Sequence, residues 1–410
     1  KVKDQPQPEE RNIETTDLGP VIGGKNQTCY VKHRGWNNRV IDSYGGWFAS
    51  NHATTLEQWL QASDLMALSI NWLGADRQGH LAYVYCGLGK SRHSFGDDRL
   101  PARRPALFPF PDARLSGTDP ASGFYANWNC PPIGGFRNGD LQTGWGADQR
   151  TRFLADRLES SRGRWSVDFL KQLDQDIAFT DQRAYFFKDD LVQLLKVDAA
   201  DARLHQAAQE LREWDGMRVD RNDDGQFDRV APRLFDAWWN RLFGTLFGET
   251  LGEMAWLVGS DSTWTQSVLL KRALYMQASF DYLRGRPAEV VVTEALASAV
   301  ADLASPGRQL EPGSAPVMEF AGVNHAGVPS QCPPATFTPY LNRGSDVQIM
   351  RLTPDGITLL GVMPPGNTEF GPHATDQIEP FRSFAWRERP LTYRDVRRVC
   401  HKLELLRVTP

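Results

Sequence analysis

The sequence predicts an α+β fold, in which a sheet-rich core is interrupted by a large helical region. Residues 1–150 combine β-favouring runs with long loops rich in proline and glycine. Residues 151–305 follow helical spacing, and residues 306–410 return to strands before the C-terminal tail. Runs of strands separated from runs of helices are typical of α+β proteins. We therefore expect these three regions to form the parts of the fold.

The first region is expected to begin with strands and to continue with a helix. Residues 1–50 are interpreted as strands because Thr28–His33 favours β structure and Gly45–Gly46 is typical of a turn. A helix is expected from Thr54 to Leu68, since a threonine can cap its start and its leucines and Trp59 recur at helical spacing.

A hairpin is expected over Asn71–Tyr85, turning at Asp-Arg-Gln-Gly. Residues 86–145 hold many prolines and should form a long, structured loop region. Further helices are expected over 148–160, 165–176, 182–195, 199–214, 231–248, 262–283 and 287–304. Strands should follow at 346–352 and 357–363, with a last helix from about Thr392.

Composition excludes several classes of protein. The chain has 410 residues, of which 41% are hydrophobic and 23% charged, so neither disorder nor a coiled coil is expected. A formal net charge of −4 argues against a nucleic-acid-binding protein. No stretch approaches the roughly 18 apolar residues that a membrane-spanning helix needs. Thirteen tryptophans and 21 phenylalanines indicate apolar pockets or a thick aromatic core.

The sequence lacks several familiar catalytic motifs. Gly89-Lys-Ser91 resembles the end of a phosphate-binding loop, but Val84 occupies the position of the required first glycine. There is no HExxH motif, no GxSxG nucleophile elbow and no GxGxxG dinucleotide fingerprint. These absences exclude a zincin and a standard α/β-hydrolase.

One acidic loop has the spacing of a calcium-binding loop. Such a loop needs oxygen ligands at its first, third, fifth and ninth positions and a glycine at the sixth. These positions are Asp220, Asn222, Asp224, Asp228 and Gly225. The twelfth position, where a bidentate glutamate is usual, is Ala231. An acidic turn between two helices, without metal, is the favoured alternative.

The segment Gly123–Asn129 resembles "GYIANWNN" of the penicillin acylases, which are N-terminal-nucleophile hydrolases. Other pieces resemble the same family in the same order: Ser69–Asp76 ("INW..AD"), Asp98–Pro101 ("PRLP"), Asp140 with Gly146–Arg150 ("D…GGADR"), Trp214–Gly216 with Asn222–Gly225 ("WDG…NDDG"), and Asn342–Gly344. The resemblance covers nearly the whole chain. It implies the αββα sandwich of that family, here partial and carrying a large helical insertion.

The chain departs from the family at its start. In penicillin acylases the β chain begins with the catalytic serine, whose amino group acts as general base. Position 1 here is Lys, and the match begins well inside a family β chain. The resemblance therefore implies that the nucleophile, the N-terminal β segment and the α chain belong to other parts of one precursor, as in a heterodimer.

The resemblance also assigns roles to individual residues. Asn129 matches the oxyanion-hole side chain, and Arg150 matches an arginine that orients it; their alternatives are a loop asparagine and a helix-surface arginine. Trp47 and Ile70 align with walls of the acyl pocket, although core packing explains them equally well.

Metal and thiol roles complete the expected site. Asp140 and the carbonyl of Asp98 match two ligands of the family's structural calcium, and a capping aspartate is the alternative for Asp140. Cys130 is interpreted as structural, because the sequence shows no partner that would activate it.

Two functions are consistent with these residues. The first is an amidase that cleaves the linear amide of an acylated β-lactam, acyl-homoserine lactone or lipopeptide through an acyl-enzyme. The second is a non-catalytic, acylase-like binding module without its own nucleophile. A calcium-dependent adhesion or scaffold module is a third, weaker interpretation of Asp220–Asp228. The resemblance alone implies export to the periplasm or outside the cell.

Overall fold

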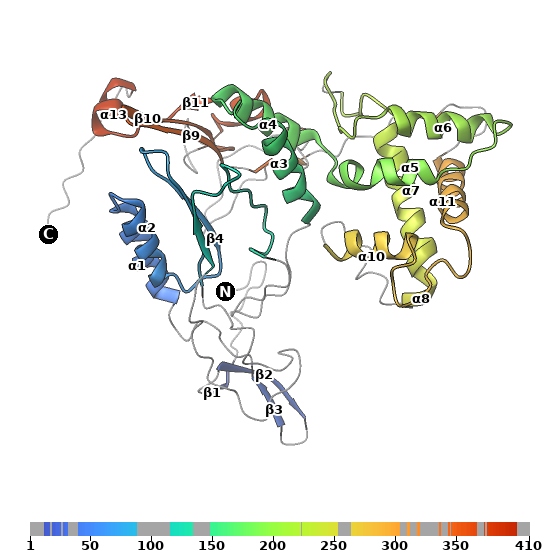
Figure 1. The fold of residues 1–410 in the computed structure, drawn as a ribbon, viewed down its shortest axis with the longest axis horizontal. Helices are drawn as coiled ribbons and strands as arrows, with labels where there is room; N and C mark the ends of the chain where they lie inside the picture. Colours follow the sequence, from blue (N-terminus) through green and yellow to red (C-terminus); the bar gives the residue numbers. More distant parts are fainter. Residues whose placement is uncertain are drawn as a thin grey trace, which may run out of the picture. The chain divides into compact units, whose positions relative to one another are not determined.

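The protein combines helices with small antiparallel sheets, as the order of elements in the sequence predicts (Figure 1). A computed structural model describes residues 12–16, 19–25, 28–31, 40–87, 115–133, 148–222, 224–252, 264–303, 310–311, 318–319, 336–337, 343–344, 346–366, 373 and 375–399. The chain divides into two units, Lys1–Trp145 and Gly146–Pro410. The three-region division drawn from composition stays a prediction.

The described residues of the first unit form two three-stranded antiparallel sheets and a pair of helices. One sheet has the order β1-β2-β3, and the other has the order β4-β5-β6. The elements are β1 (Thr15–Thr16), β2 (Gly19–Lys25), β3 (Thr28–Val31), α1 (Val40–Asn51), α2 (Leu56–Ala62), the 3-10 turn η1 (Ser63–Leu65), β4 (Asn71–Ala75), β5 (Leu81–Tyr85) and β6 (Ser116–Thr118). The predicted hairpin is therefore present as β4 and β5, and the predicted capped helix as α2 with η1.

The expectation of strands throughout residues 1–50 is wrong for α1. Gly45 and Gly46 lie inside this helix rather than in a turn. A Cβ on Gly46 would lie 2.7 Å from the Met66 sulfur and 3.0 Å from the Ala62 carbonyl oxygen, so the helices approach too closely for a larger residue. Ser43, fully buried, accepts hydrogen bonds from the amide groups of Ala67 (2.9 Å) and Leu68.

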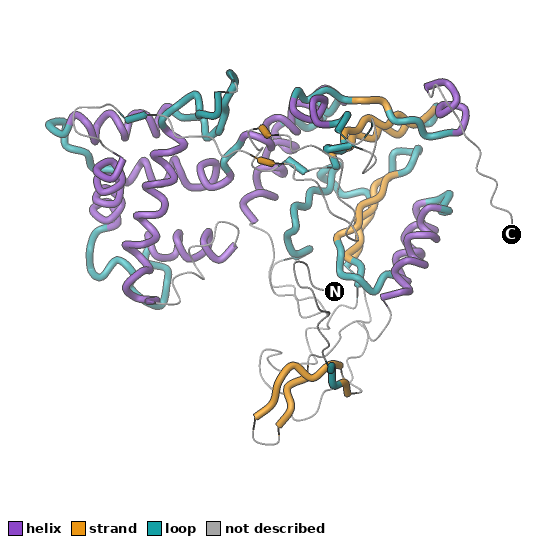
Figure 2. Tube along the Cα trace, turned by 180° about the vertical axis from the view of Figure 1, so that it is seen from behind, coloured by secondary structure: helices purple, strands orange, loops and turns teal. Residues whose placement is uncertain are grey.

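The second unit is built mainly from helices. They are α3 (Asp148–Ser160), α4 (Val167–Phe179), the π-helix η2 (Ala184–Lys188), α5 (Asp189–Leu194), α6 (Ala202–Glu213), α7 (Ala231–Phe243), the π-helix η3 (Gly244–Gly248), α8 (Glu249–Leu251), α10 (Trp264–Leu274) and α11 (Ala288–Leu303). Figure 2 shows helices and connecting loops throughout the part of this unit from α5 to α11. Most of these elements agree with the helical periodicity of the sequence.

The helix predicted over 262–283 is shorter than expected. It ends at Leu274, because Met276 adopts a left-handed conformation (φ 53°) and the amide group of Gln277 donates to the Arg272 carbonyl oxygen at 2.7 Å. A left-handed residue closes a helix by satisfying its last carbonyl groups. Turns then connect α10 to α11.

The core of the helical part forms around α7, which packs along α11. Trp238 and Phe235 on α7 are fully buried, together with Trp214 before it. The Trp238 indole N–H donates to the Val292 carbonyl oxygen of α11 at 3.0 Å, so the buried ring keeps a polar partner. The many aromatic residues of the sequence therefore serve chiefly as core here.

A group of charged side chains joins α7 to residues that precede it in the sequence. Asp181, 3% exposed, contacts both Arg183 and Arg218 at 2.8 Å, and Arg218 also contacts Asp236 on α7. Burial, the largest influence, raises the pKa of Asp181, but the two arginines outweigh it and lower that pKa to about 2. The Asp181 carboxylate therefore stays ionised and holds both arginines in place.

The C-terminal region of the second unit returns to sheet. Strands β9 and β10 form an antiparallel hairpin, with β11 on the far side of β10. The elements are β7 (Met318–Glu319), β8 (Thr336–Phe337), β9 (Val347–Thr353), β10 (Gly356–Val362), α12 (Ile378–Arg382), β11 (Arg387–Glu388) and α13 (Tyr393–Val399). The Arg343 side chain, fully buried, contacts Asp174 of α4 at 2.9 Å and the rings of Phe381 and Phe384.

No helix among the described residues combines the length and the apolar character that crossing a bilayer requires.

Candidate active site

The turn that carries Asn129 is the best-defined part of the predicted site. Asn129 is exposed and adopts a left-handed backbone conformation, with φ at 55°. Asparagine tolerates this conformation better than most residues with a side chain. The Asn129 amide N–H donates to Oδ1 of Asn127 at 3.0 Å, which closes a small turn. The exposed carboxamide of Asn129 is therefore displayed on a constrained backbone.

Both ends of the Asn127 carboxamide form hydrogen bonds within this turn. Its Nδ2 donates to the carbonyl oxygen of Cys130 at 3.2 Å and contacts the Cys130 sulfur at 3.1 Å. The same carbonyl oxygen accepts a second bond, at 3.3 Å, from Nδ2 of Asn71 on β4. The contacts of the Cys130 backbone and thiol thus agree with the structural interpretation of this cysteine.

Tyr83 on β5 fixes the orientation of Asn71. Its hydroxyl donates to Oδ1 of Asn71 at 2.6 Å, which leaves the Asn71 Nδ2 directed to Cys130. Burial, followed by the nearby Cys130 and Tyr85, raises the pKa of Tyr83 well above its usual range. Tyr83 therefore stays a protonated donor at neutral pH.

Tyr125 anchors the start of the same segment to the sheet. Its ring lies 5.6 Å from that of Tyr83, and a Cβ on Gly117 of β6 would lie 2.9 Å from its hydroxyl. The amide group of Asp119 donates to the Leu81 carbonyl oxygen, which extends the pairing of β5 and β6. The Asn127–Cys130 turn is thus supported by all three strands of its sheet.

Trp47 and Ile70 have different surroundings. Trp47 lies on α1, is 36% exposed, and contacts Tyr44 edge to face with ring centroids 5.6 Å apart. Ile70 is half-buried and packs against the small core of Met66, Val84 and Cys86. The exposed indole of Trp47 is available to a ligand or to another segment, whereas Ile70 contributes to packing. Their roles as pocket walls stay predictions.

Three predicted site residues fall partly or wholly outside the described residues. Asp98 and Asp140 lie outside them, and so do the expected calcium contacts of both. Arg150 lies in the first turn of α3, in the second unit, and its side chain is not among those described. The predicted support of Asn129 by Arg150 therefore stays a prediction.

The acidic loop uses its oxygens for its own turn. Asp220 accepts hydrogen bonds from the amide groups of Asp224 and Gly225, and Asp224 accepts from Gln226. Arg221 bonds Asp228 at 2.5 Å. The Asn222 carboxamide donates to Asp224 at 2.9 Å.

These contacts do not suit a calcium ion as they stand, because a guanidinium already neutralises one of the carboxylates. No group of three or more His, Cys, Asp or Glu in the described ranges is arranged to hold a metal. Calcium binding at this loop would require the side chains to exchange these bonds for metal contacts.

The sequence motifs indicate Asn129 but not the residues that support its turn. Asn71 and Asn127 lie in the family motifs "INW" and "ANW", and both donate to the carbonyl oxygen of Cys130. Asn71 and Cys130 are 59 positions apart in the sequence. Two asparagines in neighbouring family motifs are the only signal that could have indicated the network. Chemically, the arrangement can present one amide N–H₂ donor to a developing negative charge.

Comparison with known proteins identifies relatives for the whole chain. A family model described as penicillin amidase matches residues 1–398. The chain is 26% identical over 428 aligned residues to penicillin G acylase from Escherichia coli. That alignment covers 93% of this chain but 50% of the relative, so the chain spans about half the length of this relative.

A solved structure agrees with this assignment. The thermostable penicillin G acylase from Alcaligenes faecalis superposes with a TM-score of 0.84 at 25% sequence identity. The superposition covers all of this chain and 80% of that chain. The architecture of the chain is therefore that of part of this enzyme.

Proposed function

The chain belongs to the penicillin amidase family, and we propose that it forms part of an amidohydrolase that cleaves the linear amide of an acylated substrate. The observation that carries this proposal is the turn at Asn129, whose carboxamide is exposed while its backbone is held by Asn127. A fixed amide donor costs no reorganisation when negative charge develops on the substrate oxygen. Acylated β-lactams, acyl-homoserine lactones and lipopeptides share the required amide.

In the proposed reaction the Asn129 Nδ2–H donates to the oxyanion of the tetrahedral intermediate. The nucleophile is an N-terminal serine on a segment of the precursor outside this sequence. This serine forms an acyl-enzyme, which water then hydrolyses. Arg150 supports Asn129, and Trp47 with Ile70 lines the acyl pocket. A partial αββα sandwich, a structural calcium at Asp98 and Asp140, and export to the periplasm or the medium belong to the same proposal.

The surface of α1 supports the proposal that other segments of the precursor cover this chain. Ile41, Tyr44 and Phe48 lie at helical spacing and are 70%, 57% and 67% exposed, whereas Ser43 and Gly46 on the inner face are small. A helix usually buries its large apolar side chains. We infer that the complementary half of the precursor covers this outer face of α1.

Labelling of the assembled protein tests the catalytic proposal. Phenylmethylsulfonyl fluoride should modify one serine at the start of a companion chain, as read by intact mass and peptide sequencing. Asn129→Asp keeps the size of the side chain but removes the donor, and should lower kcat by about 100- to 1,000-fold. Asn129→Gly suits the left-handed backbone and should show a similar loss without lowering the melting temperature.

If the reagent modifies no serine in the assembled protein, hydrolysis through an acyl-enzyme is refuted, and a non-catalytic binding module becomes the better interpretation.

Coexpression with the complementary half tests the α1 surface. Phe48→Lys should prevent assembly, whereas Met350→Lys, at an exposed position on β9, should not. Equal assembly of both variants would refute the role of α1.

A further inference from the structure

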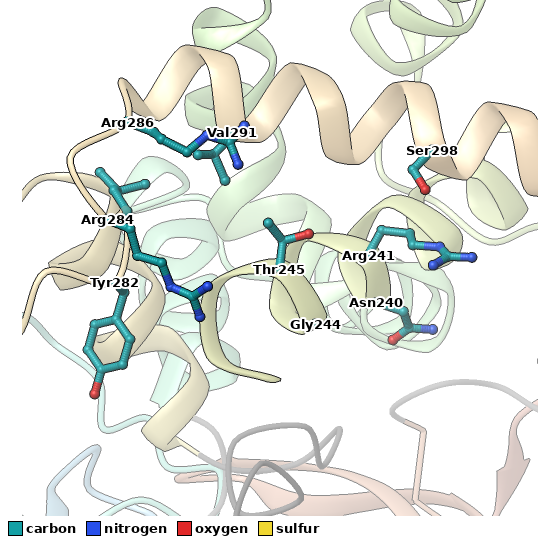
Figure 3. A pocket seen from close by; sticks show the side chains of 10 residues that line it. Asn240, Arg241, Gly244, Thr245, Tyr282, Arg284, Arg286, Val291 and Ser298 are labelled. Atoms are coloured by element: carbon teal, nitrogen blue, oxygen red, sulfur yellow. The ribbon is translucent and has the colours of Figure 1, made fainter. Parts of the chain in front are cut away.

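A polar pocket lies within the helical part of the second unit, among residues that the proposed acylase reaction does not use. Its volume is about 390 Å³. Three segments line it: the end of α7 with η3, the loop before α11, and α11 itself (Figure 3). All of these segments belong to one closely packed unit, in which α7 lies against α11.

Three arginines are the charged side chains among the residues that line this pocket. Arg241 comes from α7, and Arg284 and Arg286 come from the loop before α11. Arg241 is bonded to Asp302 at 2.5 Å, and Arg286 is bonded to Glu294. Each of these carboxylates comes from α11 and holds its arginine in a defined orientation, while each guanidinium retains further N–H donors.

Neutral donors complete the lining of the pocket. Thr245 in the π-helix η3 and Ser298 on α11 each supply a hydroxyl group. In Figure 3, Thr245 is seen between the side chains of Arg284 and Arg241. Tyr282 adds a phenol whose ring is held by Phe247, with ring centroids 4.9 Å apart.

The backbone around the pocket has two unusual features. Thr245 lies in a π-helical turn, a conformation often found at functional sites. Arg284 adopts a left-handed conformation, with φ at 54°, which disfavours any residue that has a Cβ. The next residue, Gly285, is also left-handed, and glycine is the residue that suits this conformation best. Position 284 thus carries a guanidinium where the backbone alone would favour glycine.

We propose that this pocket binds a small ligand carrying two or more oxyanion groups, either phosphoryl groups or carboxylates. Guanidinium groups bind both kinds of oxyanion with paired hydrogen bonds. Three arginines from two segments, spread around a pocket of this volume, suit several anionic groups better than one. The hydroxyls of Thr245 and Ser298 would bind the neutral oxygens of the same ligand.

Calorimetry of the assembled protein with pyrophosphate, citrate and inorganic phosphate tests this proposal. Pyrophosphate or citrate should bind saturably and more tightly than phosphate, and the tighter of the two identifies the ligand as phosphoryl or polycarboxylate. Arg284→Gly removes the guanidinium and suits the left-handed backbone. It should weaken binding about tenfold or more without lowering the melting temperature.

Met276→Gly is the matched control. Met276 is also left-handed, at φ 53°, but does not line the pocket. This variant should bind like the wild type. The proposal is overturned if neither pyrophosphate nor citrate binds, if Arg284→Gly binds as well as the wild type, or if Met276→Gly loses as much affinity. None of these readouts depends on amide hydrolysis, so they leave the proposed acylase function untouched.

Discussion

Replacing Asn127 with alanine tests whether Asn127 supports Asn129, the proposed oxyanion donor. The substitution removes the acceptor of the Asn129 N–H at 3.0 Å and one donor to the Cys130 carbonyl oxygen at 3.2 Å. That carbonyl keeps its bond from Asn71, and the exposed Asn129 amide can turn to water. The turn therefore loses its restraint while the protein remains folded.

The expected loss follows from the number of bonds. A net hydrogen bond contributes about 1 kcal/mol, so one to two lost bonds correspond to about 1–2 kcal/mol. Since about 1.4 kcal/mol is a factor of ten, the productive conformation of the turn becomes about 5- to 30-fold less populated. We expect kcat of the assembled enzyme to fall by that factor, with KM little changed, and by less than in Asn129→Asp.

Single-turnover acylation, followed by release of the leaving amine, measures this loss most directly. Asn127→Asp keeps Oδ1 for the Asn129 N–H but replaces the donor to Cys130, so it should fall between wild type and alanine. A kcat for Asn127→Ala within twofold of wild type would refute the reasoning, because the turn would then be held without Asn127. If Asn127→Ala lowers the melting temperature as much as a substitution in the hydrophobic core does, its lower kcat would result from general unfolding.

Three further outcomes are expected. Ser43→Ala should lower the free energy of unfolding by about 1–3 kcal/mol in urea titration, since two buried amide groups lose their acceptor; an unchanged midpoint would contradict this. Asp181, whose pKa is lowered to about 2, should stabilise the fold above pH 4 by roughly 2 kcal/mol, and this contribution should disappear as the pH falls from about 4 to 2. Asp181→Asn should unfold more easily at neutral pH and should lose less stability in acid. If the wild type and the variant lose the same free energy of unfolding as the pH falls, the role of the carboxylate is refuted. Calcium calorimetry should show no heat that depends on Asp224, and heat lost in Asp224→Ala would establish a metal site in the acidic loop.

Local patterns predicted most of the helices and the main hairpins. The expected helix over 231–248 is present as α7 and η3, because its apolar spacing reflects a face that is buried within this chain. The hairpin over Asn71–Tyr85 follows from its turn and alternating residues. The end of α10 was missed because the left-handed residue there is a methionine rather than the glycine that usually marks such an end.

The candidate site was predictable only in part. The resemblance predicted a role for Asn129, and one short motif carries both the residue and its turn. The bond from Asn71 to Cys130 joins residues far apart in the sequence, and no local pattern encodes it. The same limit applies to the buried Asp181–Arg218 pair, whose residues are 37 positions apart and are separated by η2, α5 and α6.

The misread helix α1 shows that a glycine pair can allow close packing of helices rather than form a turn. Small residues such as Gly46 lie where α1 meets its neighbouring helix, and large apolar residues such as Phe48 lie on its exposed face. If another segment covers the outer face, the same residues are suited to a helix packed on both sides. The proposed cover over α1 would account for the exposure of Phe48, and the assembly experiment with Phe48→Lys tests it directly.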